Sequence, residues 1–118
     1  MNEPKYILQQ DILIPRDDGE HLRVEIRISE PFLTKGRDGD PVWACQLRLS
    51  GLYDTINPAK GLTSFGAMMH ACIGAYQLLA EVVGPKGKVV ALNPRTPVPP
   101  SPSDFLTLKQ LFQFGGIK

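Results

Sequence analysis

The clearest pattern in the chain is the alternation of apolar and polar residues from His21 to Ser29. The two sets differ sharply in character: Leu22, Val24, Ile26 and Ile28 on one side, Arg23, Glu25 and Arg27 on the other. A period of two predicts a strand with one buried and one solvated face. Residues 6–14 are also rich in Ile and Leu, and the turn-forming sequence Arg-Asp-Asp-Gly-Glu lies between the two segments. We therefore expect a β-hairpin at the start of the chain.

Later segments extend this predicted sheet. Residues 42–50 read as one strand whose buried face carries Trp43, Cys45, Leu47 and Leu49. Residues 52–56 and 88–92 are candidates for a fourth and a fifth strand. Residues 30–41 are expected to be a loop, with Gly36, Gly39 and Pro41 as breakers. The whole arrangement predicts a small antiparallel sheet of three to five strands.

One long helix is predicted over residues 63–83. Thr63 or Ser64 can cap its first turn, and a Gly-Pro pair at 84–85 ends it. The segment is apolar nearly all round, so we expect a deeply buried element that packs on the sheet and on something else along one flank. Three small residues recur every four positions and should let one face approach another backbone closely: Ala67, Ala71 and Ala75. The predicted class is α+β.

The C-terminal part has a different character. We expect a core domain over residues 1–92, followed over residues 93–118 by a stiff proline-rich arm and a short helix capped at residue 103 or 104. That helix would carry an apolar patch suited to a protein partner or a second copy of the chain: Phe105, Leu108, Leu111, Phe112 and Phe114. The alternative is that the helix folds back onto its own chain.

Composition excludes some function classes. The 118 residues are 42% hydrophobic and 21% charged with a net charge of +1, which fits one globular domain and points to no nucleic acid partner. Residues 65–83 have roughly the 20-residue length of a membrane span. His70 and Glu81 would be costly in lipid, so no membrane partner is expected. No apolar signal segment opens the chain, which favours the cytoplasm and two reduced, buried thiols at Cys45 and Cys72.

Candidate chemistry is sparse. The possible soft metal ligands are His21, Cys45, His70 and Cys72, and no two have the spacing of a zinc-binding pair. A reactive thiolate favours a helix N-terminus or a neighbouring cation, whereas Cys72 falls in the middle of the predicted helix. We therefore expect no catalytic residue, no metal and no cofactor, and hence a protein that is not an enzyme.

The strand Val-Trp-Ala-Cys-Gln-Leu-Arg-Leu-Ser-Gly at 42–51, the entry Gly-Leu-Thr-Ser at 61–64 and the long helix together resemble a family of small uncharacterised bacterial domains. In that family a Trp-x-Cys strand ending in glycine precedes one long helix. The resemblance covers residues 5–92 and implies a compact core of three strands and a helix, with no catalytic residues carried over. In size and plan the chain is also similar to bacterial immunity proteins, which neutralise toxins.

Three functions follow as hypotheses. The first is a non-catalytic protein-binding module, most concretely an inhibitor or immunity-type protein that blocks a toxin or another enzyme. The second is a small-molecule-binding or enzymatic domain with a pocket between sheet and helix, near Trp43 and His70. The third is a structural subunit of a phage or secretion assembly.

Overall fold

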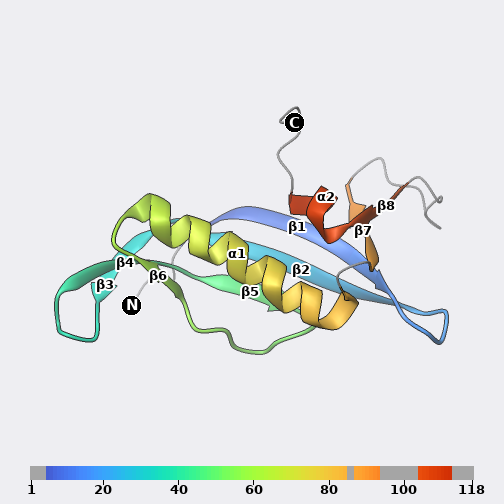
Figure 1. Ribbon diagram of the computed structural model, residues 1–118, viewed down its shortest axis with the longest axis horizontal. Helices are drawn as coiled ribbons and strands as arrows, with labels where there is room; N and C mark the ends of the chain where they lie inside the picture. Colours follow the sequence, from blue (N-terminus) through green and yellow to red (C-terminus); the bar gives the residue numbers. More distant parts are fainter. Residues whose placement is uncertain (1–4, 85–86, 94–103, 113–118) are drawn as a thin grey trace.

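The computed structural model describes residues 5–84, 87–93 and 104–112, which form an α+β fold of two antiparallel sheets and two helices (Figure 1). In chain order the elements are β1 (Tyr6–Pro15), β2 (His21–Ser29), β3 (Phe32–Lys35), β4 (Pro41–Cys45), β5 (Leu47–Ser50), β6 (Ala59–Gly61), α1 (Ser64–Val83), β7 (Lys88–Leu92), β8 (Phe105–Thr107) and α2 (Leu108–Phe112). The predicted α+β class and the long helix are confirmed.

The larger sheet has five strands in the order β5-β2-β1-β7-β8. Its centre is the predicted hairpin, in which β1 and β2 pair antiparallel along their whole length. The alternation seen in the sequence appears directly in the burial of β2, where Val24, Ile26 and Ile28 are buried. The predicted strand at 88–92 is also confirmed, since β7 pairs antiparallel with β1.

The strand expected over residues 42–50 is divided in two at Gln46. β4 belongs to the smaller sheet and β5 to the larger one. The change of sheet is stabilised by the fully buried Ser29, whose N–H donates to the Gln46 carbonyl at 2.9 Å. The Gln46 N–H in turn donates to Ser29 Oγ at 2.8 Å. The prediction of one continuous strand was therefore wrong. Where the strand is interrupted, the N–H and carbonyl groups of Gln46 bond to Ser29, which is 17 residues away in the sequence.

The smaller sheet has three strands in the order β3-β4-β6. β3 lies inside the segment expected to be a loop, and it forms a hairpin with β4. The fourth strand expected over residues 52–56 does not form, and β6 pairs with β4 a few residues later instead. The strands thus divide between two sheets rather than building the single sheet that the sequence predicted.

Helix α1 follows its predicted bounds. Thr63 is the N-cap, and its side chain accepts from the Gly66 N–H at 2.9 Å. The helix ends at Gly84, whose φ of +85° is readily adopted only by glycine. Its fully buried residues lie at intervals of four and include the predicted alanine face: Ala67, Ala71, Ala75 and Leu79. Gly61 of β6 lies so close to the first turn that a Cβ there would come within 2.5 Å of the Ala67 nitrogen.

The expectation that α1 is deeply buried was wrong for most of its circumference. Phe65, Met69, Ile73 and Val82 are all at least 44% exposed. The small sheet and the β2–β5 side of the large sheet cover one face of the helix, and α2 lies against a second flank (Figure 1). By length and composition alone α1 could cross a membrane, which is weak evidence because core helices of soluble proteins pass the same test.

The C-terminal helix begins later than predicted. Phe105 lies in β8, which pairs with β7 and extends the large sheet, so it is not helical. Helix α2 begins at Leu108 after a capping box, in which the Gln110 N–H donates to Thr107 Oγ1 and the Thr107 N–H donates to Gln110 Oε1. Most of the proline arm and Phe114 lie outside the described residues.

Candidate functional site: an apolar groove

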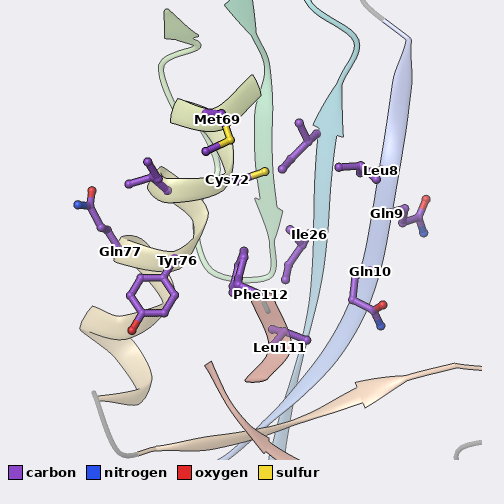
Figure 2. Close-up of a pocket in the computed structure, with 12 residues that line it drawn as sticks. Leu8, Gln9, Gln10, Ile26, Met69, Cys72, Tyr76, Gln77, Leu111 and Phe112 are labelled. Carbon is purple, nitrogen blue, oxygen red and sulfur yellow. The ribbon is translucent and has the colours of Figure 1, made fainter. Parts of the chain in front are cut away.

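A groove lies between α1 and the strands β1 and β2 and is closed at one end by α2 (Figure 2). Its volume is about 750 Å³. Twelve residues line it: Leu8, Gln9, Gln10, Ile26, Ile28, Met69, Cys72, Ile73, Tyr76, Gln77, Leu111 and Phe112. We call it the apolar groove.

The floor of the groove comes from the inner face of the hairpin. Ile26 and Ile28 alternate along β2 and are almost fully buried. Leu8 points towards the groove from β1 but remains 48% exposed, because it lies at the mouth (Figure 2). The side chain of Gln9 points away, as expected for the next residue of a strand (Figure 2).

The wall is one face of α1. The lining positions follow the helical spacing of three and four residues: Met69, Cys72, Ile73, Tyr76 and Gln77. Met69 and Ile73, which are 44% and 47% exposed, stand at the mouth. Phe65 precedes Met69 by one helical turn and is 74% exposed, so the same apolar face continues beyond the groove.

The closed end is formed by the C-terminal helix. Leu108 is buried against the core and anchors α2, while Leu111 and Phe112 point into the groove (Figure 2). The Phe112 ring meets the Tyr76 ring edge to face, with centroids 5.7 Å apart and planes at 83°. This is a favourable aromatic geometry. Helices α1 and α2 therefore meet at this end of the groove, although Tyr76 and Phe112 are more than thirty residues apart in the sequence.

The lining carries no charged residue. Its polar side-chain groups are the Gln10 and Gln77 amides, the Tyr76 hydroxyl and the Cys72 thiol. The Gln10 amide donates to the carbonyl oxygens of Asp11 and Leu92 at 2.8 and 2.9 Å, so it is already engaged with the backbone. Such a lining offers apolar contact and amide hydrogen bonds to a ligand. It contains no carboxylate or imidazole to transfer a proton.

The two cysteines are free thiols in different positions. Cys45 is fully buried, and its pKa is raised by burial and further by the negative charge that an ionised Cys72 would carry. Cys72 is half-buried at the groove, and burial raises its pKa as well. A raised pKa keeps the thiol protonated at neutral pH, and the protonated form is a poor nucleophile.

The structure separates the residues that the sequence singled out. Leu111 and Phe112 line the apolar groove, Leu108 at the start of α2 is buried in the core, and Phe105 is half-buried in β8. Trp43 and His70 do not line the groove. Trp43 pairs with Gly61 in the small sheet, and the exposed His70 places Nδ1 against the Lys60 carbonyl. A carbonyl only accepts, so Nδ1 carries the proton in this arrangement.

Sequence reasoning missed the residues of β1 that line the groove. Leu8 carried a usable signal, because it is an apolar residue near the start of a predicted strand. Nothing in the sequence indicated that the helix would stand away from that part of the strand.

A second, polar hollow of about 430 Å³ lies beneath the loop that follows β5. Its lining includes Arg48, Asp54 and Asn57. The Gln46 amide donates to the Ile56 carbonyl at 3.1 Å and ties this loop to the sheet. This hydrogen bond explains why the loop lies against the sheet.

Among residues 5–84, 87–93 and 104–112, no three His, Cys, Asp or Glu side chains are grouped as a metal ion would need. Comparisons of the chain with protein-family models, with curated proteins and with solved structures give no match. The resemblance to small bacterial Trp-x-Cys domains and to immunity proteins therefore stays a prediction.

Proposed function

We propose that this chain is a non-catalytic protein-binding module of the inhibitor or immunity type, and that it holds an apolar segment of its protein partner in the apolar groove. The observation that carries the proposal is the groove itself, whose uncharged lining faces water. Contiguous apolar side chains that face water are where soluble domains commonly bind partners.

The openness of the groove favours a protein partner over a small ligand. Leu8, Met69 and Ile73 at its mouth are each 44–48% exposed. Small-molecule sites usually enclose 70–90% of the ligand surface, which an open groove does not do. The apolar face also continues along α1 to Phe65, so the surface offered is longer than the groove. A partner segment that follows α1 would cover both.

The test selects peptides from a random displayed library against the full chain and measures their affinity for two variants. Ile73→Glu places a charge at the mouth of the groove. Val82→Glu is the matched control, because Val82 lies on the same helix, is 46% exposed and does not line the groove. We expect Ile73→Glu to weaken peptide binding by about tenfold or more, since a desolvated carboxylate without a partner costs well over 1.4 kcal/mol. Val82→Glu should bind like the wild type.

Equal binding by all three proteins, or the absence of any selected peptide, would overturn the proposal. Thermal unfolding of each variant checks that both remain folded.

A second candidate function, binding of a small apolar molecule, is favoured by the volume of the groove, which falls within the usual range of about 300–1,000 Å³ for ligand sites. Native mass spectrometry of the purified protein distinguishes the two. A small molecule retained by the wild type and Val82→Glu but lost from Ile73→Glu would favour this second function.

A further inference from the structure

The apolar groove already receives one helix at its closed end. Helix α2 places Leu111 and Phe112 between α1 and the β1–β2 hairpin, as Figure 2 shows. Leu108 lies one turn earlier in the same helix and is almost fully buried in the core. These three positions, at i, i+3 and i+4, form one face of a helix. The space between α1 and the hairpin therefore accepts side chains at helical spacing.

Beyond α2 the same wall continues towards the mouth of the groove. Tyr76 meets the Phe112 ring at the closed end, and Ile73 and Met69 follow along α1. Phe65 adds one more turn and is 74% exposed. We call Phe65, Met69, Ile73 and Tyr76 the apolar row. It is about 16 Å long at the rise of an α-helix, so a helix of about three turns would cover it.

The polar groups of the lining favour a helix over an extended segment as the occupant. A helix bonds its own backbone N–H and C=O groups within the segment. An extended segment on this surface would need partners for its backbone groups, and leaving them unpaired costs free energy. The Gln10 amide is engaged with two backbone carbonyls. Among the lining side chains, the Gln77 amide, the Tyr76 hydroxyl and the Cys72 thiol are then left as partners, which is too few for a segment of this length.

We infer that the partner segment is an amphipathic α-helix, which lies along the apolar row and places side chains spaced by three and four residues in the apolar groove. This deepens the proposed function and rests on it. The face towards the groove is apolar and uncharged, because the lining has no charged group to pair with a buried charge. The opposite face is polar and meets water. Recognition of this kind reads a partner through apolar anchors at i, i+3 or i+4, and i+7.

The experiment starts from a displayed library of peptides of about 20 residues, which is long enough for five helical turns. It uses the tightest peptide selected against the full chain whose binding is weakened by Ile73→Glu. Alanine replaces each residue of this peptide in turn. We expect losses of about tenfold or more at positions spaced by three and four residues, where an apolar side chain leaves the groove, and little change elsewhere.

Two further measurements on the peptide test its conformation directly. Proline at a central position that tolerates alanine should weaken binding by about a hundredfold, because proline in the interior of a helix removes a hydrogen bond and clashes with the preceding turn. An extended segment would tolerate proline at such a position. The Cα chemical shifts of isotopically labelled peptide should become helical on binding, over about three turns or more.

Two variants of the protein test the length of the contact. Phe65→Ala removes the outermost side chain of the apolar row and should weaken binding of the peptide by about fivefold or more. Val82→Ala is the matched control, because Val82 lies on the same helix, is 46% exposed and does not line the groove. It should bind like the wild type. Thermal unfolding of both variants checks that they remain folded.

The failures are distinguishable. A peptide weakened by Ile73→Glu would overturn the helix, while the proposed function stands, if its losses alternate, if it tolerates proline, if its shifts are not helical or if it is indifferent to Phe65→Ala. Peptides indifferent to Ile73→Glu would instead overturn the proposed function.

Other occupants of the groove would be recognised in the full chain without peptide, and each would contradict a separate partner helix. A dimer in sedimentation that Ile73→Glu converts to a monomer would identify a second copy. NMR contacts between the Phe114 ring and the Ile73 methyl groups in the monomer would identify the end of the chain itself.

Discussion

The two faces of α1 reverse the usual relation between size and burial. The face that packs on the sheets carries mostly the smallest apolar side chains, with Ala67, Ala71 and Ala75 fully buried. The face at the apolar groove carries large ones, yet Met69 and Ile73 remain nearly half exposed. Small residues let the helix approach the sheets closely on one side, as Gly61 does from β6. The large residues on the other side reach into a space that they do not fill.

We expect the core face of α1 to contribute most of the stability that the helix gives to the fold, because its side chains have no exposed surface. A face that is apolar but not packed adds little to stability and leaves surface to be covered by something else. We therefore expect substitutions on the groove face and on the core face to act independently.

The largest difference in the free energy of unfolding is expected between two alanine truncations, one on the core face of α1 and one on its groove face. Leu79→Ala removes a side chain with no exposed surface and should lower the free energy of unfolding by about 2–5 kcal/mol, because it leaves a cavity. Ile73→Ala on the groove face should cost less than about 1 kcal/mol. Denaturant unfolding of both variants measures the pair. Equal losses would show that the groove wall is packed as tightly as the core.

Enlarging a side chain tests the close approach. Ala71→Leu should lower the free energy of unfolding by about 1–3 kcal/mol, since the added carbons have no room between helix and sheet. Met69→Leu, two residues away but facing the groove, is the control and should have little effect. An unchanged melting temperature for Ala71→Leu would contradict close packing of the alanine face.

A smaller effect is expected from pH, through the buried thiol on the core side. The pKa of Cys45 is raised in the folded protein, so above about pH 8.5 the unfolded chain loses this proton while the folded chain keeps it. The contribution of this thiol to the free energy of unfolding is therefore complete below its pKa in the unfolded chain. It is lost as the pH rises through its higher pKa in the folded protein. Unfolding at pH 7 and pH 10 should show a larger loss for the wild type than for Cys45→Ala. An equal loss in the two proteins would mean that other groups control this pH range.

How far the sequence predicted each region depended on how local the determining contacts are. The bounds of α1 followed from its own ends, because Thr63 caps the first turn and Gly84 takes a positive φ after the last. The β1–β2 hairpin followed from alternation and one short turn. Both sets of signals lie within a few residues of the structure they specify.

The misassigned elements depend on distant partners. Alternation in residues 42–50 continues unbroken through Gln46, and only the hydrogen bonds from Ser29 show where the strand changes sheet. Phe105 looks helical beside Leu108 and Leu111, yet pairing with β7 makes it part of a strand. The Thr-x-x-Gln sequence at 107–110 is a capping box that could have located the start of α2.

The candidate site was only partly predictable. Of the residues singled out in advance, Leu111 and Phe112 line the apolar groove, and the rest of its lining comes from β1, β2 and α1. Periodicity showed that α1 is apolar nearly all round. It could not show which side the sheets would leave uncovered, since that depends on how the strands divide between two sheets.

The smallest effect is expected at the outermost residue of the groove face, and it tests whether that face is uncovered in solution. Phe65 is 74% exposed in the first turn of α1, and Phe65→Gln leaves the Thr63 cap intact because that cap bonds the Gly66 N–H. In a monomer the free energy of unfolding should change by no more than about 0.5 kcal/mol. The measurement is the thermal midpoint of both proteins over a hundredfold range of concentration. For a monomer neither midpoint depends on concentration, whereas association of folded chains raises it by mass action. A wild-type midpoint that rises with concentration, and ceases to do so in Phe65→Gln, would show that a second copy covers Phe65 and that the two faces of α1 are both buried in solution.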